Sequence, residues 1–385
     1  MNQEACTKPG RLFFADNLRW SMIILVLFVH ASVTYSSLGS WFYRDNAGTS
    51  DSADIVFAIF QIFIQAFFMG VLFLLAGYFV PGSFQRKGMT KFLRDRVIRL
   101  GVPALIFMFL VAPPTNYFAN QESWQAEGVA SFGDWLGNYL PDPKKWDSGP
   151  LWFTLALLLM TVAWVGFSVL MRDRWRLPRF ELKQRHLVFL ALFMGVTSFV
   201  VRIWYPIGES VWNMQLCFFS QYISLFVFGV LAYRNGWLTS ISKKMARPWK
   251  FLWIFLVLVL FPILAISGGA TNDDGINNYF GGMHWQSFTF SLWLEAYCVA
   301  IIVVLIVAYR ERFNRQGRIP KFMSDNSFAV YVFHAPVLVG IAIAISTTNI
   351  PVLLKMPMLA FSGLFVTLLL AAYVVRKIPY LKDLF

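Results

Sequence analysis

Charged residues are scarce in this chain of 385 residues, because Asp, Glu, Lys and Arg together make up only 14% of it. Soluble globular domains carry about 25% charged residues. Hydrophobic residues make up 58% and aromatic residues 18%, a composition that suits lipid contact and membrane interfaces. The composition excludes an ordinary soluble domain and predicts a multi-pass membrane protein.

Cysteine and acidic residues are scarce as well. The three cysteines, Cys6, Cys217 and Cys298, have neither the number nor the spacing of a disulfide framework or a zinc site, and we expect no bound metal. Lys and Arg outnumber Asp and Glu by 33 to 20, which gives a net charge of +13. Basic residues that flank membrane spans on the cytoplasmic side explain this charge without a nucleic-acid partner.

Ten apolar stretches approach or exceed the length of about 20 residues that a helix needs to cross a bilayer. They lie at about 17–38, 55–80, 100–118, 150–171, 187–205, 214–233, 251–267, 286–309, 327–346 and 356–375. The connections after the second, fourth, sixth and eighth stretches are strongly basic, and the others are not. The sequence therefore predicts an all-α domain over residues 1–385, with about ten transmembrane helices and both termini in the cytoplasm.

Two ionisable residues stand at the ends of "RWSMIILVLFVH", residues 19–30, in the first stretch. Eleven residues make about three helical turns, so Arg19 and His30 share one face about 16 Å apart, and Asp16 extends that face. An ionisable group at this depth costs several kcal/mol unless it meets a partner or a cavity. A neutral imidazole suits a general base. The alternatives are a structural histidine and, for Arg19, an interfacial anchor.

Two further ionisable residues lie within apolar stretches. His334, in "YVFHAP", follows Tyr331 by one turn and precedes Pro336, which interrupts helical hydrogen bonding. A broken helix at membrane depth usually borders a cavity, although a structural bond from His334 to a carbonyl is the alternative. Glu295, in "SLWLEAYC", is suited to orienting an imidazole, binding an acceptor hydroxyl or forming a salt bridge to another helix, and the sequence leaves this choice open.

The connection after the second stretch, predicted as a loop over residues 86–99, is rich in cations. Asp95 is its one acidic residue, and its basic residues are Arg86, Lys87, Lys91, Arg94, Arg96 and Arg99. Guanidinium groups suit phosphate recognition, but the cytoplasmic bias of basic residues explains every such connection equally well.

Five segments, in order, resemble acyltransferase family 3, the bacterial membrane O-acyltransferases. They are "ADNLRWSMIILVLFVH", "FFMGVLFLLAGYF", "FLRDRVIRLGVP", "GPLWFTLALLL" and "SFAVYVFHAPVL". The resemblance covers essentially the whole chain. Ala76 replaces the usual Ser of the second segment, and Trp20 replaces the Gly that commonly follows the Arg of the first. Trp20 and the following "VTYSS" look closer to the branch of periplasmic glucan succinyltransferases.

The resemblance implies an acyl-CoA-dependent O-acyltransferase in the bacterial inner membrane. Such an enzyme moves an acetyl or succinyl group from cytoplasmic acyl-CoA, its co-substrate, to a hydroxyl of an extracytoplasmic carbohydrate. It uses no permanently bound cofactor. The implied catalytic residues are His30, Arg19 and Asp16, and the implied acyl-CoA site comprises Arg94, Arg96, Arg99, Tyr331 and His334. We expect no soluble SGNH-type domain, so the protein acts either alone or with a separate periplasmic glycan-handling partner.

Two other classes of protein fit parts of this pattern. A secondary transporter of a small anion or glycan precursor would also have many spans with a few charges inside them, although such proteins often contain inverted repeats that are not evident here. A scaffold in a glycan-assembly complex would leave His30 without a role. Aromatic residues in the connections expected outside suit either stacking on sugars or an interfacial belt: Trp41, Tyr43, Trp124, Trp135, Tyr139, Trp146, Tyr279 and Trp285.

Overall fold

The structure is a computed structural model that describes residues 11–45, 49–171, 179–270, 273–379 and 381–384, so Cys6 lies outside it. The described residues form helices and no named strand. Ten helical stretches among them are long and apolar enough to cross a membrane. The predicted all-α class and the predicted number of spans are confirmed, whereas the orientation of the termini stays a prediction.

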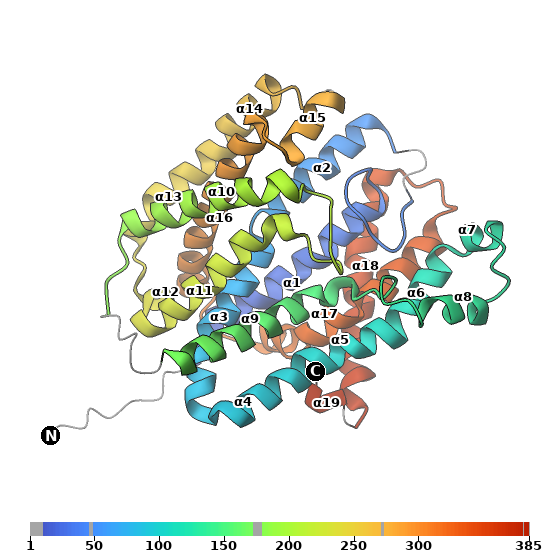
Figure 1. Cartoon of the computed structure of the whole chain (residues 1–385), viewed down its shortest axis with the longest axis horizontal. Coiled ribbons are helices and arrows are strands. Elements are labelled where there is room, and N and C mark those ends of the chain that lie inside the picture. The colour runs from blue at the N-terminus through green and yellow to red at the C-terminus, as the bar shows by residue number, and fades with distance from the viewer. Residues whose placement is uncertain (1–10, 46–48, 172–178, 271–272, 380, 385) are drawn as a thin grey trace.

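The helices follow one another along the chain as Figure 1 labels them. Their bounds are α1 Phe13–Thr34, α2 Asp51–Gln65, α3 Phe68–Lys87, α4 Met89–Arg96, η1 Val97–Gly101, α5 Val102–Ile106, η2 Phe107–Val111, α6 Ala112–Ala119, α7 Gln121–Ala126, α8 Phe132–Tyr139, η3 Gly149–Leu151, α9 Trp152–Leu170, α10 Gln184–Trp204, η4 Leu216–Phe218, α11 Phe219–Asn235, α12 Trp237–Ser240, α13 Lys243–Phe255, η5 Leu256–Leu260, α14 Phe261–Ser267, α15 Asp273–Phe280, α16 Trp285–Arg312, α17 Arg318–Ile345, α18 Val352–Tyr373, η6 Val375–Lys377 and α19 Leu381–Leu384.

Two predicted spans differ from the helices that the structure contains. The second span consists of α2 and α3, which meet at a break at Ala66 and Phe67. The third begins at Met89, and the basic segment predicted as a loop is mostly helical from there onward. That prediction was wrong because a run of basic residues was taken as a solvated loop, whereas Arg and Lys are good helix formers. Gly88, with φ +71°, separates α3 from α4.

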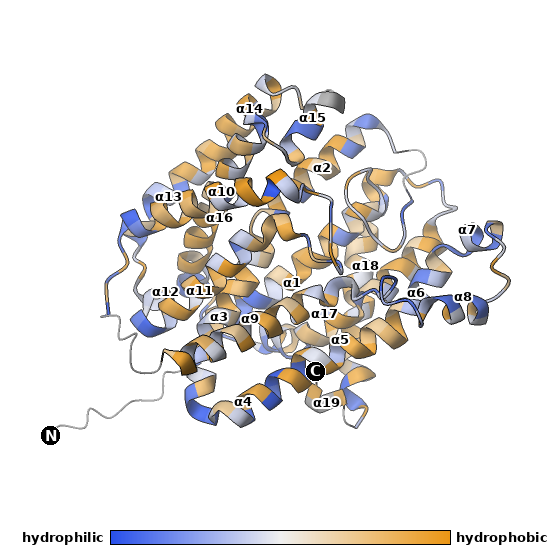
Figure 2. Cartoon of the chain, in the orientation of Figure 1, coloured by the Kyte–Doolittle hydropathy of each residue, from blue (hydrophilic) through white to orange (hydrophobic). Residues whose placement is uncertain are grey.

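The first helix lies inside the bundle. It packs against α2, α3, α16, α17 and α18, and Figure 1 shows it behind and between the other long helices. Figure 2 shows hydrophobic residues along most of each long helix, with hydrophilic residues gathered in short elements such as α4, α7 and α8. The ionisable side chains of α1 are therefore held among helices.

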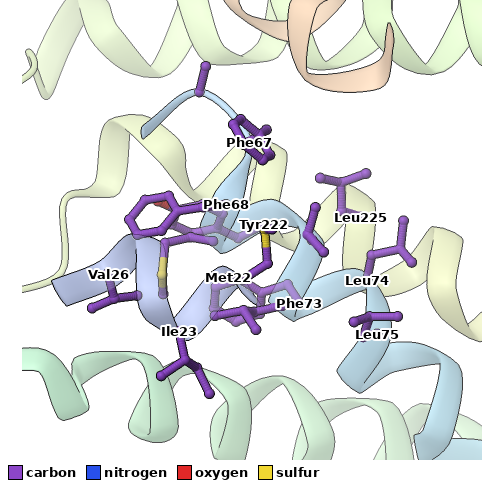
Figure 3. Close-up of a cluster of buried hydrophobic side chains, with 14 of the residues drawn as sticks. Met22, Ile23, Val26, Phe67, Phe68, Phe73, Leu74, Leu75, Tyr222 and Leu225 are labelled. Carbon is purple, nitrogen blue, oxygen red and sulfur yellow. The ribbon is translucent and has the colours of Figure 1, made fainter. Parts of the chain in front are cut away.

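The most extensive helix contact, between α3 and α11, depends on two glycines. A side-chain carbon at Gly77 would collide with the carbonyl of Phe226, and one at Gly229 would collide with the carbonyl of Leu74. Small residues allow helix backbones to approach closely inside a membrane. Side chains of α1, α3 and α11 then gather in one apolar cluster, which Figure 3 shows around Met22, and this cluster fixes the position of α1.

Candidate active site

A pair of histidines joins the first span to the ninth. The imidazole of His30, on α1, lies with its Nδ1 atom 3.1 Å from the Nε2 atom of His334, on α17. The other ring nitrogen of His334, Nδ1, lies 2.7 Å from the carbonyl oxygen of Tyr331, one turn earlier. His334 is fully buried, whereas His30 remains partly exposed. Two residues 304 positions apart thus form one hydrogen-bonded unit.

These contacts assign the ring protons of the neutral pair. A carbonyl oxygen only accepts, so Nδ1 of His334 carries a proton and its Nε2 atom accepts. The bond between the rings then requires His30 to donate from Nδ1. A neutral imidazole has a single N–H, so Nε2 of His30 keeps its lone pair. The partly exposed member of the pair therefore presents an unprotonated nitrogen.

An indole covers the same imidazole. Trp41 lies in the segment after α1 and stacks on His30, with ring centroids 3.9 Å apart and planes 15° apart. Its Nε1–H is buried and has no acceptor within the described structure. The sequence reasoning treated Trp41 as a sugar-stacking or interfacial residue and missed this contact, because position in a connection between helices carries no periodic signal.

Tyr331 anchors α17 to the start of α9. Its hydroxyl donates to the carbonyl oxygen of Pro150 in η3. Just before η3, Asp147 accepts hydrogen bonds from the backbone N–H of Gly149, at 2.6 Å, and from the side chain of Asn213. Burial raises the pKa of Asp147 above its usual value, although these two bonds act in the opposite direction. Tyr331 is thus engaged by the protein, and its implied contact with acyl-CoA stays a prediction.

The residues implied to be catalytic do not lie together. Asp16 binds Arg19 at 3.3 Å and Arg11 at 2.8 Å, and the Arg19 guanidinium lies over the ring of Phe79. Eleven residues of continuous helix separate Arg19 from His30, which corresponds to about 16 Å. Arg19 and Asp16 therefore form a second centre, at the start of α1.

The shared face of α1 between these two centres is apolar. Ile23 and Val26 lie on it and are buried. Figure 3 labels both beside the cluster around Met22. The predicted alignment of Arg19 with His30 is present, and packed aliphatic side chains occupy the space between them.

The basic residues after the second span approach the Arg19 centre. Arg96 is partly buried and lies over the ring of Phe92, while Arg94 and Arg99 are exposed. The charge of Arg96 interacts with the charges of Arg19 and Arg99. The like charges of Arg96, Arg99 and Arg19 therefore act on one another, and the phosphate-binding role implied for Arg94, Arg96 and Arg99 stays a prediction.

Glu295 belongs to a different cluster. It accepts hydrogen bonds from Ser198 at 3.0 Å and from Gln221 at 2.9 Å, and all three residues are fully buried. One turn away, Arg202 donates to Ser291 at 2.9 Å. These bonds connect α10, α11 and α16 through neutral donors, and the ion pairs of the described residues do not include the salt bridge that was one alternative for Glu295. Within the described ranges, no group of three or more His, Cys, Asp or Glu residues is placed to hold a metal ion.

Comparison with known proteins identifies the family of this chain. A family model described as an acyltransferase domain matches residues 12–376. Curated proteins named glucans biosynthesis protein C, from Escherichia coli strains K12 and O1:K1, are 27% identical over 236 residues. The match covers 58% of this chain and 58% of each relative. No solved structure matches the chain.

Proposed function

Because the chain belongs to the family that this acyltransferase domain defines, we propose that it is a multi-pass O-acyltransferase of the bacterial inner membrane. It moves an acetyl or succinyl group from cytoplasmic acyl-CoA to a hydroxyl of an extracytoplasmic glycan. The observation that carries the proposal is the hydrogen-bonded pair in which His334 leaves Nε2 of His30 unprotonated. The name of the relatives supports a glucan as the acceptor.

The donor binds through the cations near the start of α1. Coenzyme A carries phosphates at its nucleotide end, and Arg96, Arg94 and Arg99 offer guanidinium groups that suit them. Arg19 adds a cation that Asp16 holds in place. The helix rises about 16 Å from Arg19 to His30, and the pantetheine arm bridges this distance beside the packed side chains of Ile23 and Val26 to bring the thioester to the imidazole.

The transfer then needs one base. Nε2 of His30 takes the proton of the acceptor hydroxyl, and the oxygen attacks the thioester carbonyl. The tetrahedral intermediate collapses with loss of the coenzyme A thiolate, which recovers the proton from His30. The neutral His334 holds His30 in the required tautomer through the bond to Nδ1. In the alternative relay, Nε2 itself takes the acyl group, which predicts ping-pong kinetics and an acyl-enzyme.

Replacing His30 by Ala tests the proposal. The purified protein in nanodiscs receives radiolabelled acetyl-CoA or succinyl-CoA and a glucan oligosaccharide, with no ion gradient. We expect His30→Ala to lower kcat by about 10³-fold, in the range of general-base catalysis. His284→Ala removes an exposed histidine and serves as the matched control. Full activity in His30→Ala would refute the assignment, and uptake of the substrate into sealed proteoliposomes without acyl transfer by the parent protein would indicate a transporter.

A further inference from the structure

The Nε1–H of Trp41 is a buried donor without an acceptor. Tryptophan N–H groups elsewhere in the chain reach acceptors, as in Trp146, which donates to the carbonyl of Leu140, and Trp249, which donates to Gln184. Trp124 and Trp253 also lack acceptors, so the absence of a partner alone does not mark a site. Trp41 differs from them because its ring lies against the imidazole of His30, which has a free lone pair.

Hydrogen bonds of the residues that follow Trp41 fix its segment in this position. The carbonyl of the next residue, Phe42, accepts a hydrogen bond from Asn120 at 3.1 Å. Four residues after Trp41, the N–H of Asp45 donates to Thr34 at 2.7 Å. The Asp45 side chain lies 3.4 Å from the ammonium of Lys355, which is only 5% exposed. The segment that carries Trp41 over His30 is therefore held by bonds from Phe42 and Asp45 to α1, to Asn120 just after α6, and to α18.

A fixed donor beside a base has a specific use in acyl transfer. When a hydroxyl oxygen attacks a thioester, the carbonyl oxygen gains negative charge, and hydrogen-bond donors that are already in place stabilise it. A donor that awaits a substrate has no acceptor in the free protein, and this explains an otherwise costly buried N–H. The indole of Trp41 lies parallel to both imidazoles of the pair, with a centroid distance of 6.1 Å to His334.

We propose that Trp41 is a catalytic residue whose Nε1–H binds the oxyanion of the tetrahedral intermediate. This role rests on the proposed acyl transfer. The proton of the acceptor hydroxyl passes to Nε2 of His30, and the electron pair of the carbonyl bond moves onto the oxygen that Trp41 binds. Collapse re-forms the carbonyl bond and breaks the carbon–sulfur bond. The thiolate takes the proton from His30, and Trp41 keeps its own proton throughout.

The substitution Trp41→Phe distinguishes the contribution of the N–H donor from that of the stacked ring. Phenylalanine keeps a flat aromatic ring over His30 and has no donor. We expect kcat to fall by about 10²-fold, the loss that follows removal of one oxyanion donor, with KM for acyl-CoA little changed. We expect Trp41→Leu, which also removes the ring, to shift the pH dependence of kcat, because the environment of His30 changes. The assays use the full chain in nanodiscs with acetyl-CoA or succinyl-CoA.

The control is Trp249→Phe, which removes a tryptophan N–H that already has an acceptor in Gln184, and its kcat should equal that of the parent. Parental kcat in Trp41→Phe, with His30→Ala inactive, would overturn the oxyanion role and leave the acyltransferase proposal intact. A raised KM for the glucan with unchanged kcat would also overturn it, because Trp41 would then bind the acceptor. Activity in His30→Ala would instead show that the proposed function itself is wrong.

Discussion

Two of the clusters of ionisable side chains in the bundle, the histidine pair and the cluster around Glu295, can be compared, and only the histidine pair has the features of an active site. The pair on α1 and α17 leaves one nitrogen of His30 free on a partly exposed ring. The cluster on α10, α11 and α16 contains two ionisable residues, Arg202 and Glu295, both with no exposed surface. Access therefore distinguishes the clusters better than charge does.

The cluster around Glu295 links three helices by hydrogen bonds between their side chains. Ser198 and Arg202 are one turn apart on α10, and they bond Glu295 and Ser291, which are one turn apart on α16. Rings of Phe218 and Phe290 lie 5.5 and 5.7 Å from the Arg202 guanidinium. Its Nε and Nη2 atoms lack partners, as Nε1 of Trp41 does, but Arg202 has no exposed surface at all, whereas Trp41 and the adjacent His30 are partly exposed. Polar bonds across helices suit such a structural role within a membrane.

Among the variants that test this comparison, His334→Leu should cause the largest loss of activity. Leucine cannot accept from Nδ1 of His30, so the imidazole loses the bond that sets its tautomer and orientation. We expect kcat to fall by about 10³-fold, similar to the loss in His30→Ala, since the base is then misprotonated or misplaced. Acyl transfer at saturating acyl-CoA measures this effect.

A glutamine at position 334 is the matched control. Its amide oxygen accepts a hydrogen bond, so His334→Gln should retain activity within about tenfold of the parent. A structural role for His334 would reduce stability equally in the Leu and Gln variants, and thermal unfolding of both would reveal it. Equal activity in His334→Leu and the parent would show that the bond between the two rings does not set the tautomer.

Replacing Glu295 by Leu should affect stability instead of catalysis. The charge of Glu295 acts on the buried Arg202, and its loss also leaves the donors of Ser198 and Gln221 without an acceptor. We expect the free energy of unfolding to fall by about 3 kcal/mol, with kcat per folded molecule unchanged. Thermal or denaturant unfolding in lipid nanodiscs provides the first quantity, and active-site-normalised acyl transfer the second.

The double variant Arg202→Met with Glu295→Leu sharpens this test. Replacement of both buried charges by apolar residues is often neutral, so the double variant should regain most of the lost stability. A catalytic role for Glu295 would predict an inactive double variant that is nevertheless stable. That outcome would remove the distinction between the two clusters.

Much of the fold was predictable because lipid imposes strong constraints. A span must be apolar over about 20 residues, and this alone gave ten helices. The periodicity of α1 correctly placed Arg19 and His30 on one face. The helical start of the third span at Met89 was missed, because hydropathy does not distinguish a basic helix from a basic loop.

The site was predictable only in part, because its contacts join distant segments. The sequence identified His30 and His334 separately as unusual intramembrane residues, and their direct bond depends on how α1 packs against α17. Trp41 gave no signal, since its position depends on bonds to Asn120 and Lys355 from other parts of the chain. The catalytic and acyl-CoA roles of the individual residues stay predictions that the variants above test.

The smallest expected effect concerns Asp147, which supports the histidine helix through η3. Because burial raises its pKa, the folded protein holds a proton at a pH where the unfolded chain, with an ordinary carboxyl pKa of about 3.9, has lost it. Stability contributed by this group is therefore lost as the pH rises from the ordinary carboxyl pKa through the raised pKa of Asp147.

The variant Asp147→Asn keeps an oxygen that accepts hydrogen bonds from Gly149 and Asn213 but does not titrate. We expect thermal unfolding of the variant to depend less on pH in this acidic range, whereas Glu209→Gln, at an exposed carboxylate, should leave the pH dependence as in the parent. Identical pH profiles for Asp147→Asn and the parent would show that Asp147 is solvated, and that the segment holding Tyr331 is open to water.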